Sequence, residues 1–433
     1  MKTSGIFKRT LLILVILGVS QSYAQRKGSF ENTYDIPQNR EVHLNCQRGD
    51  VTVELSTENT IRLKGTYTLK SIDDDDFTTL QQAIENVKVT EDDGRLLLNC
   101  KFYEKYTSVN GRERISLGAF NVIKARGLEI RYTLYLPADL ALGIKSKYNK
   151  IHIPKMEGKV MLDIYNGELT LAGAGKKSSI KMKYSDADIG EVESASINLY
   201  DSDMELDKAV SLQLKTKYSD LQLGEVGMLQ LDSYDDKLKV EKLQSLESKG
   251  KYTEYQIMSN IEKAALDVYD CTIETMNVKL LFVKGKYNKL SSGSIAHARL
   301  EQSFDNDYRF GPLGKIECSS SKYDKLEIEQ LQKSANFEDS YDSDFEINAI
   351  GKDFKGFSGN FKYGKIDMDL SQLPAYCLKA NMTYGHLEVD KSTFTENLRY
   401  IDHNDKIEFS GCTAEGATAK INITCHDTTV DLD

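Results

Sequence analysis

The 433-residue chain has no tryptophan, only 5 prolines and, beyond residue 24, no apolar run long enough to cross a bilayer. Its 6 histidines never fall at a metal-binding spacing such as His-Glu-x-x-His, and its 7 cysteines include no Cys-x-x-Cys pair. Phosphate loops, dinucleotide fingerprints and the Gly-x-Ser-x-Gly motif are also missing. The sequence therefore predicts no catalytic site, no metal site and no cofactor.

Basic residues are in the minority, with 56 Lys and Arg against 66 Asp and Glu, for a net charge of −10. Cleavage after residue 24 would remove Lys2, Lys8 and Arg9, which leaves 53 against 66 and a net charge of −13. Such acidity argues against nucleic acids and anionic membrane surfaces as partners. The partner stays unidentified, with a glycan or an envelope protein as candidates.

The N-terminus has the features of a cleaved secretory signal. Lys8-Arg9 precedes the short apolar run 11–19, and Ser22-Tyr23-Ala24 ends it before Gln25. The run is too short to span a membrane, which disfavours the alternative of an N-terminal anchor. The first cysteine is Cys46, so a lipid anchor next to the run is not expected. We therefore predict an exported protein that is periplasmic or extracellular. Association with the outer envelope is a further option.

One short phrase recurs between residues 143 and 390: an aromatic residue followed by Asn, Asp, Ser, Thr or Gly. The aromatic residues lie 16 to 22 positions apart, mostly 17 or 18, and a short regular period of this kind predicts a solenoid. They are Tyr148, Tyr165, Tyr184, Tyr200, Tyr218, Tyr234, Tyr252, Tyr269, Tyr287, Phe304, Tyr323, Tyr341, Tyr363 and Tyr384.

Apolar residues define the register better than the tyrosines do. Pairs such as Ile144 and Ile151, or Leu162 and Leu169, bracket each aromatic corner, and successive pairs start 17 or 18 positions apart. Ser248 takes the apolar place in one repeat. Between corners, apolar and polar residues alternate as they do in strands. The expected fold is all-β: a parallel β-solenoid (β-helix or β-roll) with coils of about 17–18 residues, each with two short strands and two turns.

Two outward columns alternate from repeat to repeat. In the first column, lysine alternates with an acidic residue or Asn. In the second column, two positions further along the chain, lysine alternates with tyrosine. A coil of about 17 residues places each lysine ~4.8 Å from acids on the neighbouring strands, where an opposite-charge pair contributes roughly 0.2–1 kcal/mol. The alternative is that the alternation records only the duplication of a two-repeat unit. The first column contains Lys145, Asp163, Lys181, Asn198, Lys215, Asp232, Lys249, Asp267 and Lys284.

The corner tyrosines complete the candidate surface lattice. They could stack on the rings of a sugar ligand; the interpretation we adopt is that each ring packs beside a neighbouring lysine stem and covers the corner. Asn, Asp, Ser and Gly after each tyrosine suit left-handed corner residues. Acidic corners such as 201–203 and 342–344 could be calcium loops, but the third acid is missing in other repeats, so turn chemistry is preferred. The lattice tyrosines are Tyr148, Tyr184, Tyr218, Tyr252 and Tyr287.

Outside the repeats, residues 25–142 form a β-rich N-terminal region and cap. Asp73–Asp76 precede apolar residues spaced three or four apart, which predicts an amphipathic helix; a calcium site is the alternative for these four acids. Residues 103–125 are polar and are predicted to be a loop before a strand over 128–136. Residues 143–390 are the solenoid, and residues 391–433 the terminal coils with a C-terminal cap. The tripeptide Arg48-Gly49-Asp50 is interpreted as a turn.

An oxidising compartment permits disulfides among the seven cysteines. Cys412 with Cys425, and Cys46 with Cys100, are candidate pairs, and the odd number leaves at least one free thiol. We expect Cys271 and Cys318 to be buried and inert.

Residues 130–137, the following Leu140-x-Leu142-x-Ile144 and 149–153 resemble the bacterial putative-adhesin β-solenoid family, which includes the head-GIN type. Residues 47–53 look like its opening coil and 166–171 like an internal coil. The resemblance implies a right-handed β-helix and a surface or envelope role, and it brings no catalytic residues. This sequence departs by placing Tyr-Asn or Tyr-Ser-Asp where glycine is usual.

The sequence is therefore interpreted as an exported, non-catalytic β-solenoid that acts as an adhesin or envelope binding scaffold. Two alternatives stay open: a lyase or hydrolase that acts on polysaccharide from a β-helix, and an envelope component linked to a signalling system.

Overall fold

The computed structural model describes residues 25–118 and 121–433, so the predicted leader at 1–24 lies outside the described residues. The chain divides into two compact units. Unit 1 contains the residues up to 30, 66–86 and 102–130, and unit 2 contains 31–65, 87–101 and 131–433. Three strands run through a boundary between the units: β1 (Arg26–Asp35), β4 (Thr60–Leu69) and β10 (Glu129–Leu136).

Unit 1 contains the helix α1 (Asp74–Glu85) and a three-stranded antiparallel sheet of β7 (Lys105–Val109), β8 (Arg112–Ser116) and β9 (Val122–Arg126). The predicted helix is confirmed: three acids occupy its first turn, and Leu80 and Ile84 are buried. The predicted loop at 103–125 is wrong. Each of these strands is five residues long, and the alternation that buries Ile115 and Ile123 is too brief to stand out in a polar segment.

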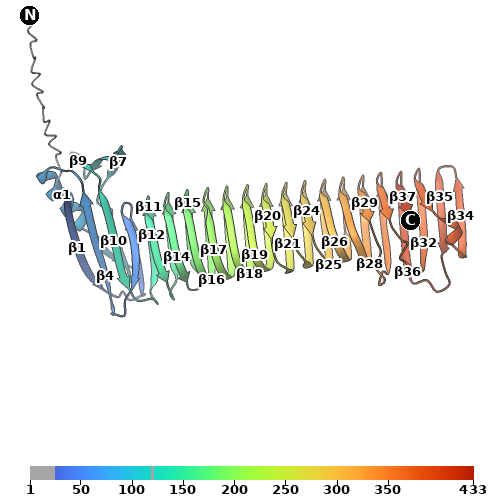
Figure 1. The fold of residues 1–433 in the computed structure, drawn as a ribbon, viewed down its shortest axis with the longest axis horizontal. Coiled ribbons are helices and arrows are strands. Elements are labelled where there is room, and N and C mark those ends of the chain that lie inside the picture. Colours follow the sequence, from blue (N-terminus) through green and yellow to red (C-terminus); the bar gives the residue numbers. More distant parts are fainter. Residues whose placement is uncertain (1–24, 119–120) are drawn as a thin grey trace, which may run out of the picture. The chain divides into compact units, whose positions relative to one another are not determined.

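Unit 2 is built almost entirely of strands (Figure 1). Its first strands precede the long repeat in sequence: β2 (Glu41–Cys46), β3 (Asp50–Leu55), β5 (Lys88–Asp92) and β6 (Arg95–Asn99). The strands of the repeat follow in order: β11 (Ala141–Lys147), β12 (Lys150–Lys155), β13 (Val160–Tyr165), β14 (Glu168–Ala174), β15 (Ser178–Lys183), β16 (Asp186–Tyr200), β17 (Met204–Lys217), β18 (Asp220–Tyr234), β19 (Lys237–Lys251), β20 (Glu254–Ile257), β21 (Ile261–Tyr269), β22 (Thr272–Thr275), β23 (Val278–Lys286), β24 (Lys289–Ser292), β25 (Ile295–Phe304), β26 (Asp307–Cys318), β27 (Ser321–Lys322) and β28 (Lys325–Tyr341). The last elements are β29 (Asp344–Ile347), β30 (Gly356–Lys362), β31 (Lys365–Met368), β32 (Tyr376–Thr383), β33 (His386–Val389), η1 (Lys391–Thr393), β34 (Glu396–His403), β35 (Lys406–Cys412), β36 (Ala419–His426) and β37 (Thr429–Leu432).

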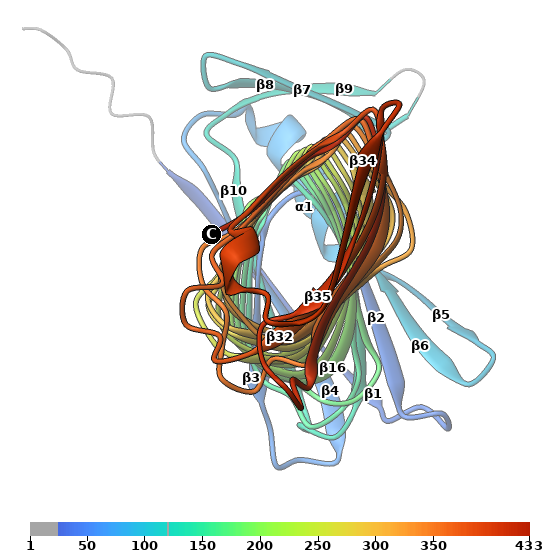
Figure 2. The same ribbon diagram turned by 90° about the vertical axis from the view of Figure 1, so that its right-hand side faces the viewer.

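The predicted parallel solenoid is confirmed, with about 13 turns. Ile180 pairs with Ile197, Ile197 with Leu214 and Leu214 with Leu231, always in parallel and 17 residues apart. Seen along the stack, the coils of unit 2 superimpose as closed loops (Figure 2). The inward residues predicted to bracket the corners are buried; the first, Ile144, and the last, Leu290, are each 2% exposed. One apolar column per inward position, continued from coil to coil, therefore makes the core.

The predicted two strands per coil hold for part of the solenoid; they do not hold for β28, which is one strand of 17 residues, or for residues 186–251. There each coil is one strand of 14 or 15 residues that runs from corner to corner. The chain bends in this segment without interrupting the pairing to its neighbours. The predicted inward position of Ser248 is confirmed, and its hydroxyl lies 2.8 Å from the buried hydroxyl of Tyr255. A small residue is needed at 248 because Tyr255 fills the space that larger side chains occupy in other coils.

The coils are not all stacked in the order of the sequence. At the start of the stack, β3 pairs in parallel with β12, so Val51 lies beside Ile151 although 100 positions separate them. At the other end, β36 inserts between β30 and β32, and β37 between β31 and β33. The last coil of the chain therefore lies one step inside the coil that precedes it in sequence. The hairpin β34–β35 then pairs antiparallel to β32 and ends the stack.

The cysteine pairing differs from the candidates. Cys412 forms its disulfide with Cys377, which faces it directly across the antiparallel pair β32–β35, and not with Cys425. This disulfide could not be predicted from the sequence, because the antiparallel pairing of β32 with β35 is an exception in a parallel fold. Cys46 and Cys100 are both buried free thiols, so the second candidate bridge is not formed. Cys271 and Cys318 are buried as expected, and burial raises the pKa of the Cys318 thiol to about 12.

A second, polar column runs inside each aromatic corner. The residue after the corner points inward, and its side chain accepts a hydrogen bond from the backbone N–H of the equivalent residue one coil earlier. Acceptors of this kind satisfy backbone groups that would otherwise be buried without a partner. The column includes Ser185, Ser202, Ser219, Asp236, Asn288, Asn306, Asp324 and Ser343, all at most 4% exposed.

Burial raises the pKa of Asp324 above its ordinary value of 3.8. Its carboxylate accepts from Asn306 N at 2.9 Å, from Asn306 Nδ2 at 3.0 Å and from Ser321 Oγ at 2.6 Å. An asparagine can reproduce these contacts, because its oxygen accepts the first two and its Nδ2 can donate to the serine. We therefore expect Asp324→Asn to stabilise the protein by on the order of 1 kcal/mol at neutral pH, since it removes a buried charge.

This advantage should shrink as the pH falls. The folded state binds the Asp324 proton more tightly than the unfolded state, so the wild type gains stability as the pH is lowered through the folded pKa and loses it again as the pH rises. Urea unfolding of wild type and variant across the acidic range measures the difference. Exposed Asp344→Asn is the matched control and should show little effect. A wild type that is more stable than Asp324→Asn at neutral pH would contradict this account.

Candidate functional surface

The charged column predicted from the sequence lies on the outer face of the coils. Register pairs place Lys145 beside Asp163, Asp163 beside Lys181, and Lys215 beside Asp232. The alternation continues through Lys249, Asp267 and Lys284. The predicted register, with each lysine next to an acid or Asn198 and never next to another lysine, is therefore confirmed.

Close ion pairs form at only part of this column. Lys145–Asp163 and Lys215–Asp232 each have a nitrogen–oxygen distance of 3.7 Å, between side chains that are 59% to 74% exposed. Exposed pairs of this kind contribute about 0–1 kcal/mol. Within the described residues, Lys249, Asp267 and Lys284 form no ion pair. The column thus contributes to register, but it leaves charged groups available in the middle of the solenoid.

The corner aromatic residues form one continuous row, which we call the aromatic ladder. Each ring meets the next edge to face, with centroids 5.2 to 5.9 Å apart and planes inclined by 65° to 90°. Edge-to-face contacts contribute about 0.5–1.5 kcal/mol each beyond the area they bury. The ladder contains Tyr148, Tyr165, Tyr184, Tyr200, Tyr218, Tyr234, Tyr252, Tyr269, Tyr287, Phe304, Tyr323, Tyr341, Tyr363, His426 and Tyr384.

The adopted interpretation of the tyrosines is therefore incomplete: rings pack on rings, and lysines are a second set of neighbours. The ammonium group of Lys147 lies 5.5 Å from the Tyr165 ring centroid, and that of Lys217 lies 4.6 Å from the Tyr234 centroid. His426 was not expected in the row at all. It comes from the inserted coil and fills the place between Tyr363 and Tyr384 in the ladder.

Two kinds of corner alternate along the ladder. In one kind the left-handed residue follows the aromatic residue, as Asp201 (φ 50°) follows Tyr200, and this is the expected arrangement. In the other kind the tyrosine itself is left-handed, as at Tyr184 (φ 56°) and Tyr218 (φ 57°). A left-handed residue with a side chain costs roughly 1–2 kcal/mol. The ring contacts on both sides offset that cost and fix the tyrosine at the corner.

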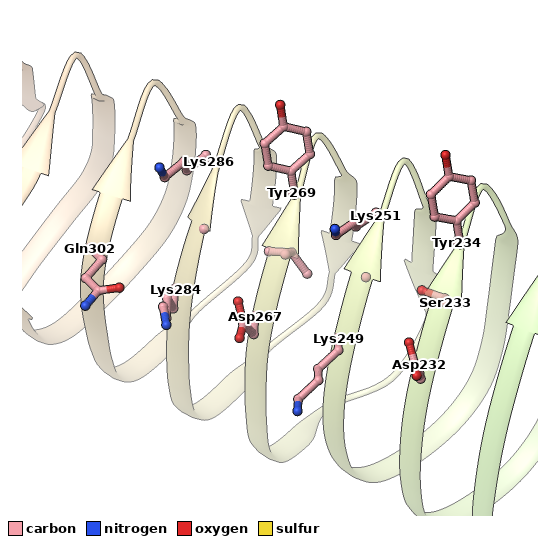
Figure 3. Close-up of a pocket in the computed structure, with 13 residues that line it drawn as sticks. Asp232, Ser233, Tyr234, Lys249, Lys251, Asp267, Tyr269, Lys284, Lys286 and Gln302 are labelled. Atoms are coloured by element: carbon pink, nitrogen blue, oxygen red, sulfur yellow. The ribbon is translucent and has the colours of Figure 1, made fainter.

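A groove lies between the aromatic ladder and the charged column in the middle of the solenoid (Figure 3). Its volume is about 550 Å³, and its walls are outward side chains two positions apart on the same strands. Its outer faces carry Tyr234, Lys251, Tyr269 and Lys286 on the ladder side, and Asp232, Lys249, Asp267 and Lys284 on the other side. The groove joins aromatic rings, ammonium groups and carboxylates within one surface.

A second hollow of about 460 Å³ lies on the strands that follow the corners and is strongly acidic. Like charges on neighbouring strands destabilise a sheet. The alternating charged column avoids such contacts, whereas this acidic patch does not. No group of acids, histidines or cysteines in residues 25–118 and 121–433 has a geometry that could hold a metal ion. The acids of this hollow are Glu168, Asp186, Asp188, Asp203, Glu205 and Asp220.

Residues 48–50 form a turn at the start of the stack. Gly49 has a φ of 112°, which suits glycine, and Asp50 Oδ1 accepts from Lys150 N at 3.0 Å. The Arg48 guanidinium lies 5.7 Å from the Tyr148 ring centroid. The tripeptide is thus part of the coil contacts, as the turn interpretation implies.

No family model matches the chain, and no curated protein matches it. One similar solved structure is described as a "putative cell adhesion protein" from Clostridium sporogenes: 7% identity, 94% of this chain and 99% of that chain covered, and a TM-score of 0.18. A second is a "putative adhesin" from Parabacteroides merdae: 12% identity, 70% and 96% covered, and a TM-score of 0.28. The fold assignment therefore comes from the strand register. No helix in the described part of the chain is long and apolar enough to cross a membrane.

The left-handed tyrosines allow a direct test of the ladder. Tyr218 contacts Tyr200 and Tyr234 with centroids 5.8 Å away on each side. Tyr218→Ala should lower the free energy of unfolding by about 1–3 kcal/mol, because two ring contacts are lost while the backbone keeps its left-handed conformation. Tyr218→Gly should recover about 1 kcal/mol of that loss, since glycine adopts this conformation without strain.

Thermal unfolding, with hydrogen exchange of residues 200–234 as a local measurement, gives the order of stability. We expect the wild type to be most stable, then Tyr218→Gly, then Tyr218→Ala. An alanine variant that is more stable than the glycine variant would show that residue 218 does not have a positive φ.

Proposed function

We propose that this protein is an exported, non-catalytic β-solenoid that binds an extended ligand along its aromatic ladder, in the manner of an adhesin or an envelope binding scaffold. One observation carries the proposal: the ladder presents ring after ring to solvent, coil after coil, beside a column in which ammonium groups alternate with the rings. Eleven of the ladder tyrosines are 37% to 62% exposed, and Tyr165 and Tyr200 are half-buried.

Exposed aromatic rings in a continuous row are unusual for a surface without a partner, because large apolar patches mark interaction sites. Each coil offers the same small set of contacts, so each single contact is weak. A ligand long enough to meet several coils engages the later contacts intramolecularly, and its affinity rises with the number of coils it covers. A repetitive polymer is the kind of ligand that fits a repetitive surface.

Two features of the sequence support export and an envelope role. The basic start, apolar run and small-residue ending at residues 1–24 are typical of a secretory signal. The resemblance of residues 130–137 and the following coils to the putative-adhesin family points to the same surface role. The acidic net charge of the chain is compatible with a ligand that is neither nucleic acid nor anionic membrane.

Two acids with raised pKa values, Asp236 and Asp324, have a structural explanation and not a catalytic one. A catalytic acid needs a shifted pKa at a position that a substrate can reach. Burial raises the pKa of Asp236 and of Asp324, but both carboxylates point into the solenoid and accept hydrogen bonds from the polar column. Their shifted pKa values therefore have a structural cause.

Arrays of glycans and envelope proteins, probed with labelled protein that starts at Gln25, test the proposal. We expect saturable binding to at least one extended ligand, with affinity that increases with ligand length. Incubation with the bound ligand should release no new reducing ends and no unsaturated sugars.

A matched variant changes Tyr184, Tyr218 and Tyr252 to Asn. Asparagine is tolerated in the left-handed conformation and already occupies an equivalent corner at Asn166, so the coils should stay folded while three rings are lost. The variant should keep its far-UV circular dichroism and lose most of the binding. Turnover of any array ligand, or binding that this variant retains in full, would refute the proposal.

A further inference from the structure

The groove at residues 232–302 differs from the rest of the lattice because it has an end. Lys284 pairs with Glu301 and Lys286 with Phe304, so two residues of the next coil face Gly285. The extra residue is Gln302, which is left-handed (φ 51°) and lines the groove. Its side-chain amide stands at one end of the row of labelled residues (Figure 3). Such a bulge changes the direction of one side chain and interrupts the regular repeat, so the groove ends at Gln302.

Two rings beside this groove, Tyr234 and Tyr269, present their faces on the outer side of the strands (Figure 3). Tyr234 and Tyr269 are each perpendicular, within 10°, to the ring of Tyr252 that lies between them. Figure 3, which looks onto the outer face of the strands, shows Tyr234 and Tyr269 face-on. Each ring is 37% exposed, so every second coil offers one aromatic face beside the groove. A face of this kind is suited to a sugar ring, whose axial C–H groups pack on it.

The coils that alternate with those of Tyr234 and Tyr269 carry paired ammonium groups. Lys249 and Lys251 belong to one coil, and Lys284 and Lys286 to the coil two steps further on. Neither Lys249 nor Lys284 has an ion-pair partner within the described residues, unlike Lys215 at the adjoining coil. Four lysines and two acids line the groove, and Glu301 lies beside Lys284 on the next coil, so lysines outnumber acids here although the chain as a whole is acidic.

The ring faces and the lysine pairs thus alternate with a period of two coils, which is ~9.6 Å at a strand spacing of ~4.8 Å. A polymer that matches this period has two kinds of unit in strict alternation. One kind carries an anion for the lysine pair, and the other is uncharged and lies on the tyrosine face. Asp232 and Asp267, on the opposite wall, can accept hydrogen bonds from hydroxyl groups of the uncharged unit.

We propose that this groove binds a linear polysaccharide in which a uronate alternates with an uncharged sugar. The inference rests on the proposed function and specifies its ligand class. The uronate carboxylates lie at Lys249–Lys251 and Lys284–Lys286, the uncharged sugars pack on Tyr234 and Tyr269, and Gln302 contacts one end of the bound stretch. From Asp232 to Gln302 the groove spans four coil steps, or ~19 Å, which is enough for two disaccharides.

The direct test is calorimetric titration of the full mature chain with three oligosaccharide series of matched length. Hyaluronan fragments have alternating glucuronate and N-acetylglucosamine, oligogalacturonates carry a uronate at every unit, and cello-oligosaccharides carry no charge. We expect the hyaluronan fragments to bind most tightly, with affinity that levels off once the fragment fills the groove. Raising the salt concentration should weaken binding, since the Debye length falls from ~10 Å at 0.1 M to ~3 Å at 1 M.

Matched double variants locate the site. Lys249→Gln with Lys284→Gln should weaken hyaluronan binding about tenfold or more, the factor that corresponds to ~1.4 kcal/mol. Lys145→Gln with Lys181→Gln changes the same column outside the groove and should leave the affinity within about twofold, a difference of less than ~0.5 kcal/mol. All four lysines are exposed, so both variants should fold. Gln302→Ala should shorten the fragment length at which affinity levels off.

Equal or tighter binding of the uniform or uncharged oligosaccharides would overturn the inference, and so would equal losses of affinity in the two double variants. Absence of binding to all three series would overturn it as well. None of these results refutes the proposed function, because the array experiment can still identify another extended ligand that depends on the ladder tyrosines.

Discussion

The structure depends on parallel hydrogen bonding between coils, at a spacing of 17 or 18 residues through most of the repeat. This register places each residue beside its equivalent in the next coil, ~4.8 Å away, so every position becomes a column. A column must then consist of residues that tolerate their own neighbours. Leucine and isoleucine meet this condition inside, hydrogen-bonding side chains meet it under the corner, and alternating charges or edge-to-face rings meet it outside.

The alternation on the outer surface follows from the same condition. Identical lysines in adjacent coils would repel, and identical tyrosines in one column would stack face to face, an arrangement that rings avoid. Alternating Lys with Tyr in one column and Tyr with Asp in the next places rings in a zigzag that continues without a break. The cost is a left-handed tyrosine in every second coil. The consequence for function is a surface with a two-coil period, and the groove near Lys249 is where that period is most open to a ligand.

Much of this could be predicted from the sequence, because the information is local. Alternation gave the strands, the spacing of Ile144, Leu162 and Ile180 gave the coil, and both outer columns followed from it. Apart from the short strands of residues 105–126, much of what could not be predicted depends on residues far apart in sequence. The coil that contains His426 inserts between two earlier coils, and Cys377 pairs with Cys412 across the antiparallel strands β32 and β35. The ladder geometry was also hidden, since spacing assigns a tyrosine to a corner but not its backbone conformation.

The coil length is the claim on which the columns, the ladder and the groove all depend, and one distance measures it. Spin labels attached through Lys145→Cys and Lys284→Cys lie in one column, eight coil steps apart. Pulsed electron resonance should give a separation of about 38 Å for steps of ~4.8 Å. A coil of twice the length would halve the number of steps and give about 19 Å, and that result would contradict the account.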